Sequence, residues 1–342
     1  MDQLTADAIA ISFDVPDDKR EIFRFIQGQH ISLSRVDGGD GKRRGYSICS
    51  PATGSELRVA IKLIPGGVFS SYVYNELAVG DELDVVSPSG RFFTRLDPAQ
   101  VKDYVAIAVG SGITPILSIL ATTLEVEPES TFTLLYGNRT SGSMMFLEEL
   151  NDLKNRFLNR FTLLHVFSRE GQEAELFRGR IDGEKLGVFL STLIDAPSTD
   201  EWFLCGPQAM VEELRSVLLE RDVEPRRIHR ELFHAGPTAP SATPASASGQ
   251  VCEVTVVLDG RSSTFPLAQD GESILDAALA VRSDAPFACK GGVCGTCRAF
   301  LVDGEVRVDG GYALEEDEIE AGFVLACQSH PQSAEVTLDF DR

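Results

Sequence analysis

Residues 289–297 read "CKGGVCGTC", and one more cysteine, Cys327, follows after a gap of 29 residues. Structural zinc sites usually present two C-x2-C pairs, or one such pair with two nearby histidines. This chain has a single C-x2-C, and its five histidines form no such pair. The spacing C-x4-C-x2-C…C is instead the ligand pattern of plant-type 2Fe–2S clusters. It predicts that Cys289, Cys294, Cys297 and Cys327 ligate such a cluster.

The glycines within this stretch have a mechanical role in that prediction. Gly291, Gly292 and Gly295 allow the backbone to wrap closely and to turn its N–H groups toward the cluster sulfurs. The chain has seven cysteines, an odd number, and four of them cluster late. Disulfides are therefore disfavoured relative to metal or redox use, as in a reducing compartment.

Composition is that of a globular protein, with 43% hydrophobic and 24% charged residues among 342. The net charge of −21 argues against nucleic acid or an anionic membrane as a partner. From Gln250 onward the chain holds 17 acidic and 6 basic residues, which suits docking to a basic protein surface. A generic solvated acidic surface is the alternative, because the sequence does not say whether these charges share one face.

No targeting or membrane segment is expected. The N-terminus, "MDQLTADAIA", is acidic and lacks the basic and apolar regions of a secretory signal. An uncharged run covers residues 104–124, but "GSGITP" interrupts it, which favours a buried strand, turn and helix over a membrane span. We therefore expect a cytoplasmic protein.

Composition shifts divide the chain. Residues 234–250, "HAGPTAPSATPASASGQ", contain no charged Asp, Glu, Lys or Arg and predict a flexible linker. Short apolar segments broken by turns in 1–100 predict an antiparallel β-barrel. Residues 101–233 alternate strand-like and helical segments, such as 144–157, and predict a parallel sheet covered by helices. The last part, 251–342, begins with a strand pair and a helix and carries the cysteines.

Two segments in 1–100 suit a flavin. "RRGYSICS" contains Arg44-x-Tyr46-Ser47, which resembles the flavin motif of the ferredoxin–NADP reductase superfamily. An arginine can neutralise a pyrophosphate, a tyrosine can pack on the flavin ring and a serine can hydrogen-bond near its N5. Alone the motif is weak, because an ordinary strand with a core-facing tyrosine would look the same.

The second segment is "KLIPGGVFSSY" (62–72), a glycine turn that opens a short helix at the place of the superfamily's second flavin signature. The backbone N–H groups at its start, together with the Ser70 hydroxyl, are expected to cradle a phosphate. The residues assigned to this cradle are Gly67, Val68, Phe69 and Ser70. Both segments together predict FAD.

Three further segments match the superfamily's nicotinamide site. "IAVGSGITPI" (107–116) runs a strand into Gly110-x-Gly112, then Thr114 and a proline begin a helix. "CGPQAM" supplies Cys205 and Gly206, which the resemblance places beside the nicotinamide; a buried structural thiol is the alternative. "RELF" closes this part, and the resemblance implies that Phe233 lies over the flavin. The resemblance assigns catalytic roles to Ser47, Cys205, Glu231 and Phe233.

The choice between NADPH and NADH depends on contacts to the 2′-phosphate. "HVFSRE" puts Ser168 and Arg169 after the third parallel strand, where a dianion would need a hydroxyl and a guanidinium. Arg139 is expected to help, and Arg178 is a further candidate. These residues favour NADPH, with NADH and a solvated surface arginine as the alternatives.

In the order of its parts the chain resembles reductases of the ferredoxin–NADP reductase superfamily fused to a plant-type 2Fe–2S ferredoxin domain. The resemblance implies an antiparallel β-barrel FAD domain, an α/β NAD(P) domain with a parallel sheet and an α+β ferredoxin-like (β-grasp) domain. It further implies electron transfer from NADPH through FAD and the 2Fe–2S cluster to the oxygenase component of a multicomponent monooxygenase.

Two segments outside the cofactor motifs indicate a subfamily within this superfamily. "LLYGNRTSGSMMFLEELNDLK" and "RGRIDGEKL" are similar to the reductase subunits of ring-1,2-phenylacetyl-CoA epoxidases, which are di-iron monooxygenases of aerobic phenylacetate catabolism. The alternative is the reductase of a Rieske oxygenase such as steroid 9α-hydroxylase, which has the same domain order. A non-catalytic redox sensor or electron carrier is a more remote alternative, because three intact cofactor motifs lie on one chain.

Overall fold

The computed structural model describes residues 1–39, 43–233, 250–282 and 284–342. The chain divides into two compact units, each described by itself below: Met1–Lys42 with Tyr46–His234, and Arg43–Gly45 with Ala235–Arg342. Most of the linker expected at 234–250 lies outside the described residues, so it stays a prediction, as do the domain boundaries. None of the helices in the described parts of the chain has the length and hydropathy of a membrane span.

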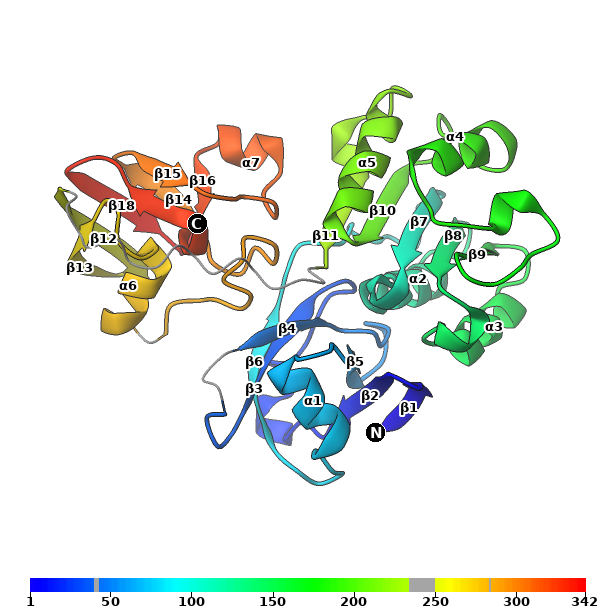
Figure 1. Cartoon of the computed structure of the whole chain (residues 1–342), viewed down its shortest axis with the longest axis horizontal. Coiled ribbons are helices and arrows are strands. Elements are labelled where there is room, and N and C mark those ends of the chain that lie inside the picture. The colour runs from blue at the N-terminus through cyan, green and yellow to red at the C-terminus, as the bar shows by residue number, and fades with distance from the viewer. Residues whose placement is uncertain (40–42, 234–249, 283) are drawn as a thin grey trace. The chain divides into compact units, whose positions relative to one another are not determined.

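The first part of the chain forms a β-barrel from two antiparallel sheets (Figure 1). One sheet has the order β1-β2-β5 and the other β4-β3-β6, and a bridge between Ile48 and Val59 joins them. Alternating apolar residues fill the interior, including Ile31, Leu33 and Ile61. The strands are β1 (Asp2–Thr5), β2 (Ala8–Phe13), β3 (His30–Arg35), β4 (Arg44–Ser47), β5 (Leu57–Lys62) and β6 (Leu83–Ser89), with helices η1 (Asp17–Lys19) and α1 (Val68–Asn75).

A five-stranded, fully parallel sheet of order β11-β10-β7-β8-β9 follows, as the alternating pattern predicts. Its strands are β7 (Asp103–Val109), β8 (Thr131–Asn138), β9 (Phe161–Phe167), β10 (Glu201–Gly206) and β11 (Ile228–Leu232). The helices are α2 (Ile113–Val126), α3 (Leu147–Arg156), α4 (Gly183–Thr192) and α5 (Gln208–Leu219), with short turns η2 (Gly110–Gly112), η3 (Ser141–Ser143), η4 (Glu175–Phe177) and η5 (Pro225–Arg227). The uncharged run at 104–124 is therefore β7, η2 and α2, buried in this unit.

The helix expected over 144–157 begins later than the pattern indicates. Met144, Met145 and Phe146 are buried in the core ahead of it, and Phe146 adopts a left-handed conformation with φ 60°. A right-handed helix cannot include a residue in this conformation, so α3 starts at Leu147, directly after Phe146. Apolar residues directly before a helix can match its hydrophobic periodicity. For this reason the helix predicted from the sequence began three residues too early.

The second unit is an α+β fold whose main sheet has the order β13-β12-β18-β14-β16. Helix α6 packs against β13, and its N-terminal cap is the Ser273 Oγ, which accepts from the Asp276 N–H. The elements are β12 (Val251–Leu258), β13 (Arg261–Ala268), α6 (Ile274–Val281), β14 (Arg298–Asp303), β15 (Val306–Val308), α7 (Glu316–Glu320), β16 (Phe323–Leu325), η6 (Ala326–Gln328), β17 (Ser329–Pro331) and β18 (Glu335–Asp339).

Candidate redox site

The flavin motif and the end of the parallel sheet meet at one hydrogen bond. Ser47, the last residue of β4, is buried, and its Oγ donates to Glu231 Oε2 at 2.8 Å. Glu231 lies on β11 directly opposite Cys205 on β10. Three of the four residues expected to be catalytic are thereby brought together although they come from three separate strands.

The fourth residue, Phe233, follows β11 directly. Its backbone N–H donates to the Gly206 carbonyl at 2.9 Å, which extends the β10–β11 ladder by one step. Its half-buried ring packs against the core of the first unit. Phe233 therefore lies at the same end of the sheet as Glu231, two residues further along the chain.

The nicotinamide loop is pressed against the end of β10. A Cβ atom on Gly112 would lie 2.4 Å from the carbonyl oxygen of Cys205, so no other residue fits at this position. Gly110 has φ 57°, in the left-handed region that glycine adopts freely. The Thr114 Oγ1 donates back to the Ser111 carbonyl at 3.1 Å and closes the first turn of the helix. The short strand-to-helix turn therefore has the form of a phosphate-binding loop.

Burial raises the pKa of the Cys205 thiol well above its ordinary value, and the nearby Glu231 carboxylate adds to this effect. The side chain is completely inaccessible to solvent. Cys205 is therefore a neutral thiol at physiological pH, and it contributes shape and close packing at this position.

The remaining flavin residues lie on β4 and α1. Arg44 and Tyr46 share β4 with Ser47, and the half-buried Tyr46 ring lies 5.8 Å from that of Phe69, centroid to centroid. In α1 the Ser71 N–H is bonded to the Gly67 carbonyl, and the N–H groups of the first turn lie ahead of it. These backbone groups fit an anion such as a flavin phosphate.

The Ser70 hydroxyl is bound within the turn itself. It accepts from the Ile64 N–H at 3.2 Å and faces the Gly67 carbonyl at 3.4 Å, and the side chain is buried. The direct contact of this hydroxyl with a phosphate stays a prediction; within the turn, the hydroxyl holds the glycine loop in shape. The sequence did not indicate this, because a serine in a first turn suits both roles.

The residues expected to choose the coenzyme lie together at the ends of two neighbouring strands. Beyond β8 and β9 the pairing continues, with the Arg169 N–H donating to the Arg139 carbonyl at 2.8 Å. Both arginine side chains are exposed, and Ser168 precedes Arg169 at the same edge. Glu170 is turned to the neighbouring loop, where it accepts from the N–H and hydroxyl of Ser141 at 2.7 and 3.0 Å.

Arg178, the further candidate at the coenzyme site, has other partners. Its Nη1 forms an ion pair with Glu175 at 3.3 Å, and its Nε donates to the Gln172 carbonyl. Its backbone continues the sheet through a bridge to Phe167. Arg139, Ser168 and Arg169 therefore lie at one edge of the sheet. The Arg178 guanidinium is instead bound to Glu175 and to the Gln172 carbonyl.

The four late cysteines occur as two pairs. All are free thiols, with Cys297 and Cys327 buried and the other two partly exposed. A hydrogen bond from Cys294, together with the N–H groups of Gly291 and Val293, holds the pKa of Cys289 below its ordinary value. Cys297 lowers the pKa of Cys327 in the same way.

This donor set fits the cluster that the spacing predicts. Each iron of a 2Fe–2S cluster takes two thiolates, and the two pairs would supply them. Among the residues the structure describes, no three His, Cys, Asp or Glu side chains are placed to hold one metal ion. The Gly291 N–H lies 3.3 Å from the Cys289 sulfur, as expected for a glycine loop that turns its N–H groups inward.

One residue of the cysteine region was missed by the sequence analysis. The Gln328 Nε2 reaches the Lys290 carbonyl at 3.0 Å, the Cys327 carbonyl at 2.9 Å and the Cys327 sulfur at 3.7 Å. It thus ties the cysteine loop to the segment of the fourth ligand. Its position directly after Cys327 is the only signal that could have indicated it.

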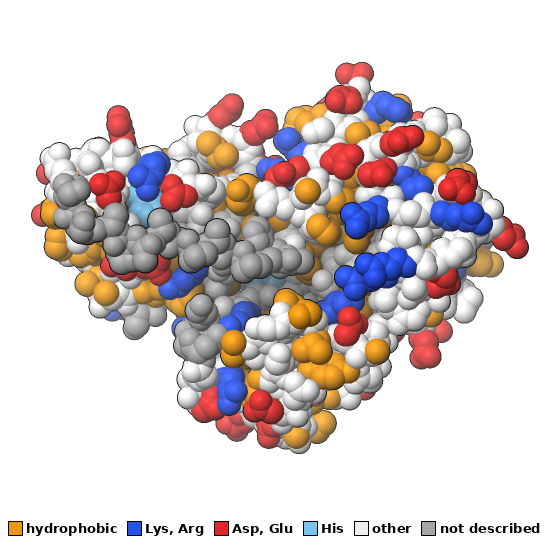
Figure 2. All heavy atoms as spheres, viewed as in Figure 1, with side chains coloured by type: hydrophobic (Ala, Val, Ile, Leu, Met, Phe, Trp, Pro, Cys, Tyr) orange, Lys and Arg blue, Asp and Glu red, His pale blue; other side chains and the backbone are white. Residues whose placement is uncertain are grey.

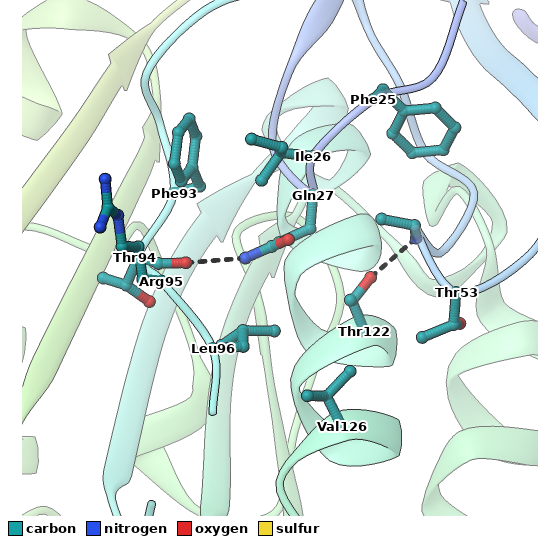
Figure 3. A pocket seen from close by; sticks show the side chains of 11 residues that line it. Phe25, Ile26, Gln27, Thr53, Phe93, Thr94, Arg95, Leu96, Thr122 and Val126 are labelled. Atoms are coloured by element: carbon teal, nitrogen blue, oxygen red, sulfur yellow. Dashed lines mark hydrogen bonds between the residues drawn. The ribbon is translucent and has the colours of Figure 1, made fainter. Parts of the chain in front are cut away.

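A separate groove of about 520 Å³ lies between the barrel and α2 (Figure 3). Two hydrogen bonds line it, one from Gln27 to the Thr94 carbonyl at 2.8 Å and one from the Ala52 N–H to Thr122 at 2.9 Å. None of the residues expected at the redox site lines this groove. Figure 2 shows acidic side chains spread over the visible face of each unit rather than gathered in one continuous patch.

Three domain families match the chain in sequence. They are an oxidoreductase FAD-binding domain over residues 1–94, an oxidoreductase NAD-binding domain over 106–216 and a 2Fe-2S iron-sulfur cluster binding domain over 256–332. The chain therefore contains binding domains for FAD, a nicotinamide dinucleotide and a 2Fe–2S cluster.

Known proteins match the chain over nearly its whole length. The 1,2-phenylacetyl-CoA epoxidase of Escherichia coli has a subunit that is 45% identical over 98% of this chain and 94% of its own. The ferredoxin reductase component of the 3-ketosteroid-9-alpha-monooxygenase of Mycobacterium tuberculosis is 33% identical over 98% and 93%. The solved structure of a phthalate dioxygenase reductase has the same fold, with a TM-score of 0.58 and 24% identity over 99% of this chain and 95% of that one.

Proposed function

The chain belongs to the family of oxygenase reductases that combine FAD-binding, NAD-binding and 2Fe–2S domains, and we propose that it serves a di-iron epoxidase of phenylacetyl-CoA. The observation that carries the proposal is the 45% identity over almost the whole of both chains. A steroid monooxygenase reductase component matches over the same length at 33%, so a Rieske oxygenase is the second candidate. In either case the partner is an oxygenase component.

When bound, FAD accepts a hydride from the nicotinamide and the 2Fe–2S cluster passes single electrons onward. The chain's own contribution begins at Ser47, whose hydroxyl is held by Glu231 at 2.8 Å. In our proposal this pair fixes the serine oxygen near the reacting edge of the flavin and keeps a proton within one hydrogen bond of it.

The end of β10 positions the other reactant. Because Gly112 lies against the Cys205 carbonyl, the loop and the end of the strand are in direct contact. We assign the dinucleotide phosphates to the loop of Gly110, Gly112 and Thr114, and the nicotinamide to the side of Cys205 and Gly206. Phe233, hydrogen-bonded to Gly206, then lies where the nicotinamide and the flavin must approach.

NADPH is the proposed electron donor. Arg139 and Arg169 come from neighbouring loops joined by a backbone hydrogen bond, and both side chains are exposed at one edge. Two guanidinium groups and the Ser168 hydroxyl suit a phosphate dianion. The Glu170 carboxylate, which would repel that phosphate, is bonded to Ser141 instead.

The test is coupling to purified oxygenase components. The FAD- and cluster-loaded protein is mixed with the oxygenase component of a phenylacetyl-CoA epoxidase or of a steroid 9α-monooxygenase, each with its own substrate. We expect substrate-dependent NADPH consumption, matched by product, only with the first. If only the steroid enzyme couples, the partner is assigned to the Rieske class instead. If neither NADPH nor NADH bleaches the flavin, both assignments are wrong.

A further inference from the structure

A buried tyrosine lies directly beneath the proposed phosphate loop. Tyr136 is on β8, paired with Ala108 of β7, and its side chain is completely inaccessible to solvent. Its hydroxyl donates to the carbonyl oxygen of Gly110 at 3.1 Å. Gly110 is the residue at which the chain leaves β7 with a positive φ and enters the loop.

This hydrogen bond holds one of the carbonyl groups of the loop. In a phosphate site, the carbonyl oxygens of the loop must point away from the anion. A loop that binds an anion presents its N–H groups, whereas a carbonyl oxygen pointing the same way would repel the anion. Here the Gly110 carbonyl accepts from Tyr136 and from the Ile113 N–H. The Ser111 carbonyl accepts from Thr114 and from the same Ile113 N–H. The first two carbonyl groups of the turn are thus held by the protein.

The tyrosine is suited to this role chemically. Burial raises the pKa of the Tyr136 hydroxyl far above its ordinary value, so the group stays protonated and serves as a donor. Its ring is buried on an interior strand of the sheet, since β8 lies between β7 and β9. The loop therefore rests on a rigid support rather than on a mobile surface side chain.

We propose that Tyr136 is a positioning residue for the dinucleotide: its hydroxyl fixes the Gly110 carbonyl and thereby keeps the N–H groups of residues 110–112 directed at the pyrophosphate. This inference rests on the proposed assignment of that loop to the coenzyme. The pyrophosphate is common to both coenzymes, so Tyr136 sets the affinity for NADPH and NADH alike. It differs in this from Arg169, which would act on the 2′-phosphate alone.

The test uses Tyr136→Phe in the loaded protein, with Tyr104→Phe as the matched control. Tyr104 is a buried tyrosine on the adjacent strand, and its hydroxyl donates to Glu127 at 2.9 Å near the opposite end of the sheet. Dissociation constants of NADP⁺ and NAD⁺ are measured by titration calorimetry, with thermal unfolding followed in parallel. We expect both constants to rise about fivefold in Tyr136→Phe, the size of one lost hydrogen bond, and to stay unchanged in Tyr104→Phe.

In steady-state reduction of a dye the KM for NADPH should rise in Tyr136→Phe by a larger factor than kcat falls. Unchanged dissociation constants in the folded Tyr136→Phe protein, or an equal loss in Tyr104→Phe, would overturn the inference. A third variant, Ser111→Asp, places a negative charge in the loop itself. If it binds both coenzymes normally, the proposed site is wrong; if it alone loses affinity, the site stands and the role of Tyr136 fails.

Discussion

Ser47 and Glu231 are 184 residues apart in the chain, yet the serine Oγ donates to the glutamate Oε2 at 2.8 Å. The serine ends a barrel strand, and the glutamate lies on the edge strand of the parallel sheet. This bond joins the flavin half of the first unit to its nicotinamide half. In the proposed site it therefore lies where the hydride is transferred.

Replacing Ser47 by alanine should slow flavin reduction by NADPH about 10- to 100-fold, because a hydrogen bond to a charged group contributes about 1.5–3 kcal/mol. Anaerobic stopped-flow measurement of flavin bleaching tests this. Ser12→Ala is the matched control, since the Ser12 hydroxyl also donates to a glutamate, Glu56, at 2.6 Å, but on the exposed side of the same barrel. Equal rates in Ser47→Ala and wild type would exclude Ser47 from the reaction.

Replacing Cys297 by serine should abolish electron transfer to the oxygenase while sparing NADPH-dependent reduction of a dye at the flavin. The substitution removes one thiolate of the Cys297–Cys327 pair and leaves the first unit untouched. Iron content and cluster absorbance report the loss directly. Cys252→Ser is the control, because Cys252 is a buried free thiol in the same unit outside the cluster loop. Equal loss of both activities in Cys297→Ser would contradict the order of the relay.

Spacing along the chain was sufficient to predict the 2Fe–2S domain and the parallel sheet. Three of the four cysteines lie within nine residues of sequence, and the alternation of strands with helices is also a pattern of neighbouring segments. The grouping of Ser47, Cys205 and Glu231 came only from the resemblance, since no local pattern records that β4 lies against β11. Tyr136 and Gln328 were missed because an aromatic residue in a buried strand and a glutamine after a cysteine are ordinary on their own.

Replacing Arg169 by alanine should raise the KM for NADPH about 10- to 100-fold and that for NADH less than about threefold. The physical reason is the loss of a charge-assisted contact to the 2′-phosphate, which NADH lacks. Steady-state dye reduction with each coenzyme measures the ratio. Arg226→Ala serves as control, because Arg226 is exposed and paired with Glu224 elsewhere on the surface. An equal rise for both coenzymes would assign Arg169 to the pyrophosphate instead.

Replacing Gln328 by leucine should lower the reduction potential of the cluster. The Gln328 amide lies 3.7 Å from the Cys327 sulfur, and an N–H group near a ligand sulfur stabilises the more negative, reduced cluster. Since the same amide also holds the Lys290 carbonyl at 3.0 Å, the cysteine loop should loosen and iron should be released faster to a chelator.

A redox titration followed by electron paramagnetic resonance measures the potential, independently of any turnover. Gln332→Leu is the matched control: its amide donates only to the neighbouring Pro331 carbonyl at 3.3 Å, among the contacts of the described residues. The isosteric Gln328→Glu separates the two effects, because it keeps the shape and replaces the donor by a carboxylate. Its potential should fall below that of Gln328→Leu, since a negative charge beside the sulfur further disfavours reduction. A potential equal to that of the wild type in both Gln328 variants would leave the glutamine with a purely structural role.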